Sequence, residues 1–252
     1  MMAATELFTA AAPRREVVWH EAPDRATLAV RVADALEAAA REAVQAGGDA
    51  FFAIAGGETP KATLHEFGRR SLPWRKVCLV PTDERIVPVA SPYSNERLLR
   101  EILPQSRVLG LMSPQTLFDH SPLTLAAQAD QRLSLLPRRF DVVLLGMGGD
   151  GHTASLFPGA AGLEGALCPA PRPAVVALTP QPLPAMAPYP RLTLTLGRLA
   201  WTRRLWLLVT GEGKRRVLES ALARPDPAHF PVSALLTPGA SSACPLEIYW
   251  AP

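Results

Sequence analysis

The stretch "FDVVLLGMGGDGHTASLFPG", residues 140 to 159, joins an apolar run to a glycine-rich turn. A continuous run of Val and Leu of this length is typical of a strand that is buried on both faces, as in a parallel sheet. The stretch also contains three glycines spaced as in the G-x-G-x-x-G pattern of dinucleotide-binding proteins: Gly146, Gly148 and Gly151. Pro158 stops the expected following helix early, and Glu164 is too close to serve as the ribose-binding acid. The motif also lies past the middle of the chain, so we reject a dinucleotide site.

Similar apolar runs recur along the chain, and several precede a helical pattern. The predicted strands are REVVWH (15–20), AFFAIAGG (50–57), KVCLVP (76–81), AVVAL (174–178), RLTLTL (191–196) and RLWLLVTG (204–211). The predicted helices run from Asp24 to about 46, from Pro60, around 94 to 103 and at about 212 to 223, with a short helical turn after residue 146. This alternation predicts an α/β fold, a Rossmann-like and mostly parallel sheet with helices on both faces. Ligands in such folds bind beyond the carboxyl ends of the strands.

We expect a single α/β domain, residues 1–252, although the length alone would also allow two domains. With 48% hydrophobic residues, the chain has ample material for a core. The formal net charge is only +3, from 26 basic and 23 acidic residues, and paired arginines are scattered along the chain. This balance argues against a nucleic-acid-binding protein, but it is compatible with an anionic small-molecule substrate.

Cysteine usage and the absence of targeting signals predict a cytoplasmic protein. The three cysteines are widely spaced and form no C-x-x-C pair, which favours neither a disulfide framework nor a zinc site. Glu6 interrupts the first apolar stretch, so the N-terminus is a poor signal peptide, and no apolar run is long enough to span a membrane. We expect a monomer, although the sequence does not fix the oligomeric state. A proline-rich loop is expected at 169 to 190, and whether it closes over a ligand stays open.

The first candidate site loop, "AIAGGETPKATL", follows a predicted strand at 53 to 64. Gly56 and Gly57 allow a tight turn, Thr59 is a suitable cap, and Pro60 suits the first helical position. Free amides at a helix start bind phosphate well. The alternative is an ordinary glycine-rich turn between a strand and a helix.

The second loop carries Asp83, Glu84 and Arg85 directly after a buried strand. Three consecutive charges at the end of a strand are unusual within a core. Taken alone, they are better explained as a solvated loop with a surface ion pair. Asn95, after Ser94, indicates a helix start and nothing more.

The third loop places Asp150, Gly151 and His152 on a glycine turn at the end of a strand. A histidine in this place is available as a general base, although it can also merely satisfy the turn. Ser155 lies in no G-x-S-x-G motif, so we expect a residue of a helical turn and not a nucleophile. The other histidines show no spacing typical of metal ligands, which argues against a metal site: His20, His65, His120 and His229.

Two basic residues follow late in the chain. Arg191 begins "RLTLTL", and Lys214 lies in the first turn of the helix after "LLVTGEG". A lysine in a first helical turn is unfavourable for the helix dipole, which favours a role in ligand binding. An exposed turn at "GEGKRR" is the alternative.

In this order, "AGGETP", "PTDERIVP...SPYSN", "GMGGDGHTASLFPG", "RLTLTL" and "VTGEGK" resemble the 6-phosphogluconolactonase family over about residues 15 to 250. The resemblance implies hydrolysis of 6-phospho-D-glucono-1,5-lactone in the oxidative pentose phosphate pathway, with neither metal nor organic cofactor. It implies that His152 takes a proton from water, that Asp150 orients the site, and that Arg85 lies near the reacting carbonyl or the sugar ring. The residues that it implies for binding the sugar phosphate are Gly56, Gly57, Thr59, Asp83, Arg191 and Lys214.

The same Rossmann-like sheet is shared with the glucosamine-6-phosphate deaminases, so two activities have to be separated. The deaminases carry roughly HIAFNEPG after the histidine, with a Glu that transfers protons, whereas Phe157 occupies that place here. The lactonase is therefore expected, and a deaminase or isomerase, a dehydrogenase or a catalytically silent sugar-phosphate-binding protein are the alternatives. A DNA-binding regulator is disfavoured because about 15 residues precede the first predicted strand, too few for a helix-turn-helix. Glu58 replaces the usual Ser of the family's first loop, and its side chain is expected to point outward.

Overall fold

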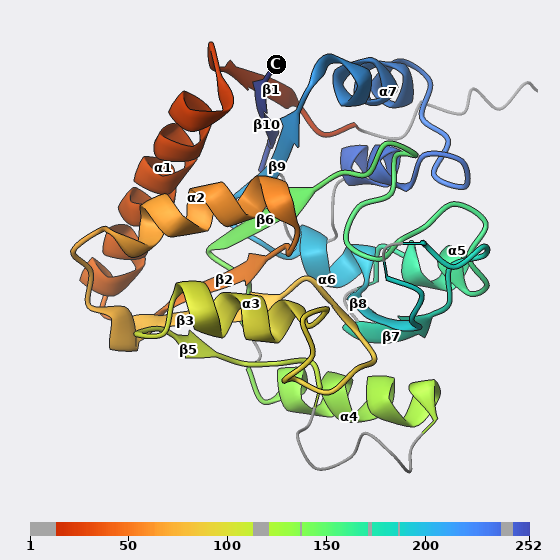
Figure 1. Ribbon diagram of the computed structural model, residues 1–252, viewed down its shortest axis with the longest axis horizontal. Helices are drawn as coiled ribbons and strands as arrows, with labels where there is room; N and C mark the ends of the chain where they lie inside the picture. The colour runs from red at the N-terminus through yellow and green to blue at the C-terminus, as the bar shows by residue number, and fades with distance from the viewer. Residues whose placement is uncertain (1–13, 113–120, 137, 171–172, 186, 238–243) are drawn as a thin grey trace, which may run out of the picture.

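Among the described residues, seven strands form the main sheet, and every neighbouring pair runs parallel (Figure 1). The computed structural model describes residues 14–112, 121–136, 138–170, 173–185, 187–237 and 244–252. The strand order is β1-β10-β9-β6-β2-β3-β5. The strands are β1 (Val17–Glu21), β2 (Ala50–Ile54), β3 (Val77–Pro81), β5 (Arg107–Val108), β6 (Val142–Gly146), β9 (Leu205–Thr210) and β10 (Leu246–Ala251). The predicted α/β fold is confirmed.

The central strands are buried on both faces, as the uninterrupted apolar runs predict. All five residues of β2 are buried. Because side chains alternate along a strand, Phe51 and Ala53 pack into one apolar cluster, whereas Phe52 and Ile54 pack into the other. The sheet therefore separates two cores, and each has to be covered by further elements.

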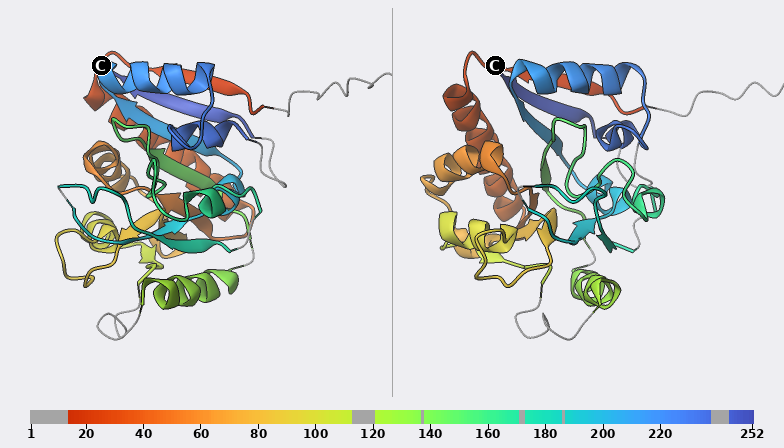
Figure 2. Two further views of the ribbon diagram at one scale, coloured as in Figure 1. Left: turned by 90° about the vertical axis from the view of Figure 1, so that its right-hand side faces the viewer. Right: turned by 45° about the vertical axis from the view of Figure 1, so that its right-hand side comes forward.

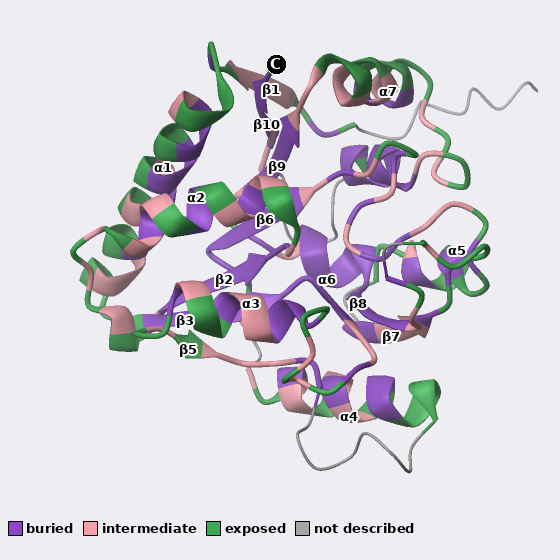
Figure 3. Cartoon of the chain, viewed as in Figure 1, coloured by how far each residue is buried: buried purple, intermediate pink, exposed green. Residues whose placement is uncertain are grey.

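Helices cover both faces of the sheet (Figure 2). The first three helices contribute to one core, and the later ones contribute to the other together with a small second sheet. Figure 3 shows the resulting pattern, in which strands are buried and the outer faces of helices are exposed. The helices are α1 (Arg25–Gln45), α2 (Glu58–Gly68), α3 (Asn95–Ile102), α4 (Pro122–Ser134), α5 (Leu163–Ala166), α6 (Leu196–Ala200) and α7 (Glu212–Ala223), with short 3-10 segments η1 (Trp74–Lys76) and η2 (Pro231–Leu236).

The second sheet corrects the prediction for two late strands. Segments 174–178 and 191–196 were expected in the parallel sheet, but β7 (Val175–Leu178) and β8 (Arg191–Leu194) pair antiparallel with each other. β4 (Asp83–Arg85) joins β8 on its other edge, also antiparallel. The physical reason is the connection, because a parallel pair needs a long crossover that is usually a helix. No helix lies among the described residues between β7 and β8.

Helix boundaries agree with the prediction in some places and differ in others. Asp24 caps α1 and accepts a hydrogen bond from the amide of Thr27, as expected. The turn predicted after residue 146 is not helical, because Gly151 and Ala154 adopt positive φ angles of +80° and +48°. Helices α4, α5 and α6 were not predicted. His120, the first 13 residues, and positions 171, 172 and 186 of the proline-rich loop lie outside the described residues.

The strand order reverses between β2 and β6. From β2 the chain moves to β3 and β5 on one side, and then returns to β6 on the other side of β2. In open α/β sheets, such a reversal leaves a crevice beyond the carboxyl ends of the two strands, where ligands bind. The glycine-rich loops after β2 and β6 flank this crevice.

Candidate active site

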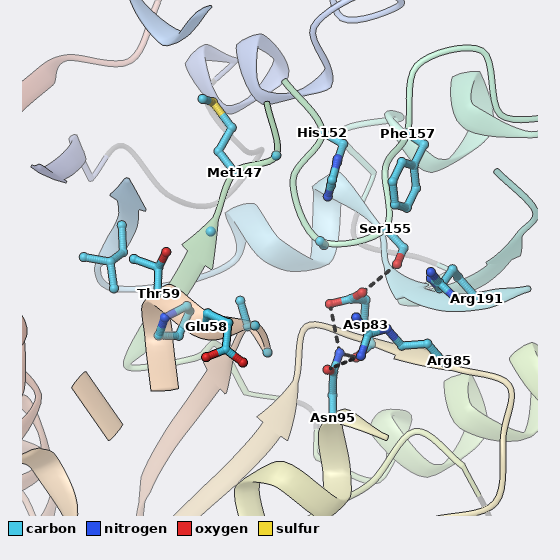
Figure 4. A pocket seen from close by; sticks show the side chains of 18 of the residues that line it. Glu58, Thr59, Asp83, Arg85, Asn95, Met147, His152, Ser155, Phe157 and Arg191 are labelled. Atoms are coloured by element: carbon cyan, nitrogen blue, oxygen red, sulfur yellow. Dashed lines mark hydrogen bonds between the residues drawn. The ribbon is translucent and has the colours of Figure 1, made fainter. Parts of the chain in front are cut away.

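A cavity of about 260 Å³ opens at the carboxyl ends of β2 and β6 (Figure 4). Its walls come from the loops after these two strands, from the second sheet, and from the first turns of α2, α3 and α7. The lining residues are Ala55, Gly56, Gly57, Glu58, Thr59, Pro60, Asp83, Arg85, Asn95, Gly146, Met147, Gly148, His152, Ala154, Ser155, Phe157, Arg191, Leu208 and Lys214.

The loop after β2 presents the start of α2 to the cavity. The N-cap is Gly57, whose φ is +99° and which has no side chain to bond the first amides of the helix. Thr59 was expected to cap this helix, but it lies within the first turn, with its hydroxyl 3.3 Å from that of Thr210. The helix therefore begins two residues before Pro60, and its first turn is available to an anion.

Asp150 and His152 form a carboxylate–imidazole pair at the loop after β6. Nδ1 of His152 lies 2.6 Å from Oδ1 of Asp150, and the amide of His152 donates to the same oxygen. Burial alone raises the pKa of Asp150, but the hydrogen bond and charge of His152 outweigh it, and the net pKa is lowered. The imidazole stacks on Phe157 at 4.1 Å between centroids and extends toward the cavity (Figure 4). Asp150 itself is not among the lining residues.

The same loop requires glycine where the imidazole passes close to the backbone. A Cβ atom at Gly148 would lie 2.2 Å from the ring of His152. The amide of Gly148 also donates to the carbonyl of His152 at 2.9 Å. Gly148, a member of the G-x-G-x-x-G pattern, therefore leaves room for the ring of His152.

The charged residues after β3 are not a solvated loop, which corrects the simpler interpretation of them. Asp83 is 8% exposed and accepts a hydrogen bond from the Ser155 hydroxyl at 2.6 Å. The side chain of Asn95 donates to the carbonyl of Asp83 and accepts from Arg85 at 3.1 Å. Figure 4 shows these side chains joined across one wall of the cavity.

Two further cations reach the cavity. Arg191, at the start of β8, is 2% exposed and donates to the carbonyls of Ala187 and Tyr189. Burial, with a contribution from the charge of Arg85, lowers its pKa to about 10, so it stays charged. Burial, followed by the nearby charge of Arg25, also lowers the pKa of Lys214, whereas Asp150 opposes this shift.

The structure brings all the sequence-predicted site residues together except Asp150, which contacts the cavity through His152. Sequence reasoning missed Asn95 and Ser155 as site residues. Both were assigned to helix starts or turns, and a signal for them was their position shortly after strands that end at the same edge. Glu58 is exposed, but it also lines the cavity, so the outward direction expected for its side chain stays a prediction.

Two further properties concern only the part of the chain that the structure describes. No three His, Cys, Asp or Glu side chains there are grouped closely enough to hold a metal ion. No helix there is long and apolar enough to cross a membrane.

Comparison with known proteins adds to this geometry. The profile of the family described as glucosamine-6-phosphate isomerases/6-phosphogluconolactonase matches residues 23–244. A 6-phosphogluconolactonase of Rhizobium meliloti is 40% identical over 226 residues, which cover 89% of this chain and 94% of the relative. One of Pseudomonas putida is 38% identical and covers 92% of each chain. A crystal structure of a 6-phosphogluconolactonase from Shewanella baltica superposes with a TM-score of 0.83 at 33% identity, covering 94% of this chain and 98% of that one.

Proposed function

The chain belongs to the family of glucosamine-6-phosphate isomerases and 6-phosphogluconolactonases, and we propose that it hydrolyses 6-phospho-D-glucono-1,5-lactone to 6-phospho-D-gluconate. This reaction is a step of the oxidative pentose phosphate pathway. The carrying observation is the Asp150–His152 pair at a cavity that also presents a helix start and three cations. An imidazole held by a carboxylate is suited to accept a proton at neutral pH.

In the proposed mechanism, Nε2 of His152 takes a proton from a water molecule while the water oxygen bonds to C1 of the lactone. The tetrahedral intermediate then collapses, the bond between C1 and the ring oxygen breaks, and the imidazolium returns its proton to that oxygen. Asp150 fixes the tautomer and stabilises the imidazolium through its 2.6 Å contact with Nδ1. A general base contributes about 10²- to 10⁴-fold, which suits a lactone that is already a reactive ester.

The anionic end of the substrate has a binding site in the same cavity. We propose that Gly56, Gly57 and Thr59 bind the phosphate through the start of α2, and that Lys214 supplies a charge beside it. We also propose that Arg191 binds the anionic ligand. Figure 4 shows it on the Asp83 side of the cavity, opposite Thr59, so an extended phosphorylated ligand meets positive charge on both sides.

Arg85 and Asp83 are proposed to hold the sugar end of the substrate. Arg85 keeps donors beyond its bonds to Asn95 and the carbonyl of Tyr93, and a guanidinium suits a carbonyl oxygen that gains negative charge. Asp83 is buried and hydrogen-bonded, and it faces the same cavity. Its carboxylate is suited to accept hydrogen bonds from sugar hydroxyls.

The experiment that tests this assignment is the His152→Ala variant. We expect it to bind 6-phosphogluconate with about the wild-type affinity but to lose about 10²- to 10⁴-fold in kcat, because the base acts mainly in the transition state. Calorimetry measures the binding, and an acid-release assay measures the turnover. Wild-type turnover in this variant would remove His152 from the mechanism.

A second activity of the same superfamily, the deamination of glucosamine 6-phosphate, is disfavoured by Phe157. In this structure the phenyl ring stacks on the imidazole where the deaminases carry a proton-transferring Glu, and a phenyl ring carries no exchangeable proton.

We further propose that the protein works in the cytoplasm as a single-domain monomer that binds neither nucleic acid nor membranes. Cys78 and Cys168 form no disulfide, which suits a reducing compartment. The exposed large apolar side chains of the described residues are few, and only two of them, Leu123 and the C-cap residue Leu135, belong to one helix, α4, which supports a monomer: Val30, Tyr93, Leu123, Leu135 and Leu183.

A further inference from the structure

Glu84 is a buried carboxylate behind the cavity that the mechanism does not use. It is 1% exposed and is not among the lining residues. Its Oε1 accepts from the amides of Arg85 and Asn95, both at 2.8 Å. Its Oε2 accepts from the hydroxyl of Ser94 at 3.0 Å and from the amide of Glu96 at 2.7 Å. Three of the four donors belong to Ser94 and the first turn of α3, so Glu84 ties this helix start to β4.

The first turn of α3 carries Asn95, whose side chain is fully committed to cavity residues. Its Nδ2 donates to the carbonyl of Asp83 at 2.7 Å, and its Oδ1 accepts from Nη1 of Arg85 at 3.1 Å. The amide also packs on the loop after β2, because a Cβ atom at Gly56 would lie 2.1 Å from Oδ1. A displacement of Asn95 would therefore move or release three residues that line the cavity.

The network continues to the loop of the proposed base. Asp83 accepts from the hydroxyl of Ser155, which lies three residues after His152. Glu84 is thus connected through hydrogen bonds to two walls of the cavity, although it touches neither the cavity nor a ligand within it.

We propose that Glu84 is a positioning residue, which fixes Arg85 and Asp83 at the cavity through the first turn of α3 and the side chain of Asn95. The inference rests on the proposed function for the reaction that Arg85 and Asp83 serve. The competing explanation is that Glu84 only stabilises α3 as a cap, with no influence on the site. The two explanations differ in whether the effect of Glu84 depends on Arg85.

A double-mutant cycle between Glu84→Gln and Arg85→Ala separates them. Gln preserves the size of the side chain, but it presents an amide donor to backbone donors and breaks at least one of the four hydrogen bonds. We expect Glu84→Gln to lose on the order of 10- to 100-fold in kcat/KM, as for a misplaced catalytic group. The double variant should lose clearly less than the product of the two single losses, because part of the effect of Glu84 passes through Arg85. Additive losses would overturn the proposal.

A matched control removes a helix cap elsewhere. The hydroxyl of Ser121 caps α4 by accepting from the amide of Thr124 at 3.2 Å, and neither residue lines the cavity. Ser121→Ala should lower Tm and leave kcat/KM unchanged, whereas Glu84→Gln should change kcat/KM. Equal kinetic losses in both variants would show that general destabilisation is the cause and would overturn the proposal.

A substitute variant and a binding measurement complete the experiment. Should Glu84→Gln fail to fold, Ser94→Ala replaces it in the cycle, because it removes one of the four donors to Glu84 at a residue that does not line the cavity. The same cycle is also run on the affinity for 6-phosphogluconate, measured by calorimetry without turnover. A wild-type protein without lactonase activity would contradict the proposed function, whereas additivity in the binding cycle would contradict the role of Glu84.

Discussion

The imidazole of His152 is fixed by its surroundings, which leaves Nε2 as the atom that can exchange a proton with a ligand. Nδ1 contacts Asp150, and one ring face lies on Phe157. The lowered pKa of Asp150 keeps its carboxylate ionised throughout the neutral range. We therefore do not expect the titration of Asp150 to change the activity in this pH range.

The cations of the cavity are expected to act on the charge of the ligand. Lys214→Ala and Arg191→Ala should each weaken the binding of 6-phosphogluconate by about 10-fold or more, as for charge-assisted hydrogen bonds worth roughly 1.5–3 kcal/mol. Calorimetry with 6-phosphogluconate and with unphosphorylated gluconate measures the effect. The loss with gluconate should be smaller for a residue that binds the phosphate. Unchanged affinity for 6-phosphogluconate in both variants would contradict the assignment of these residues.

Glu58 is an exposed residue that lines the cavity beside the proposed phosphate site. Glu58→Ser should raise the affinity for 6-phosphogluconate a few fold, because like charges at an exposed position repel by roughly 1 kcal/mol or less. Glu212→Ser is the matched control. Glu212 also begins a helix after a glycine with positive φ, but it does not line the cavity. Equal affinity changes in the two variants would show that the charge of Glu58 does not act on the bound ligand.

At the scale of elements, the long periodic helices and five of the seven strands of the main sheet were predictable from sequence, whereas β5 and β10 were not predicted. The residues from 25 to 45 and from 212 to 223 form helices close to the expected bounds, because the apolar periodicity and the end signals agree. The short antiparallel sheet was not predictable, because the apolar pattern of β8 does not reveal its partner. The positive φ of Ala154 is rare for a residue other than glycine, so the missing helical turn had no sequence signal either.

The site was predictable in part for the same reason. Residues within two positions of a glycine after a strand, such as His152 and Thr59, stand out from the local pattern. Asn95 and Ser155 stand out less, because beyond their position after the strands their role depends on hydrogen bonds to Asp83, which form only in the folded chain.

The junction of β4 and α3 predicts a pH dependence of stability. Burial raises the pKa of Glu84 to about 7, despite four hydrogen bonds that lower it, from an ordinary value of 4.5. The pKa of Glu84 is higher in the folded protein than in the unfolded chain. The contribution of Glu84 to folding stability is therefore fully present below about pH 4.5 and is lost as the pH rises through 7. Urea unfolding between pH 5 and 8 should therefore show wild type losing stability relative to Glu84→Gln. A constant difference between the two proteins would contradict the raised pKa.

For the whole molecule, the strand order places every proposed group at one edge of the main sheet. The reversal between β2 and β6 opens the crevice, the loops after these strands supply the helix start and the base, and the second sheet closes one side with Asp83, Arg85 and Arg191. Residues separated by more than 150 positions thereby line one cavity, as Gly56 and Lys214 do. The fold alone is shared with deaminases, so the chemistry has to be tested on substrates.

The most direct measurement incubates the purified protein with freshly prepared 6-phosphogluconolactone in the presence of a chelator. We expect acid release faster than the uncatalysed control, much slower hydrolysis of unphosphorylated gluconolactone, and no ammonia from glucosamine 6-phosphate. The phosphate preference follows from the dianion that Lys214 and the start of α2 would bind. Acid release that disappears with the chelator and returns with a divalent ion would contradict the side-chain mechanism. Ammonia release without lactone hydrolysis would contradict the proposed function.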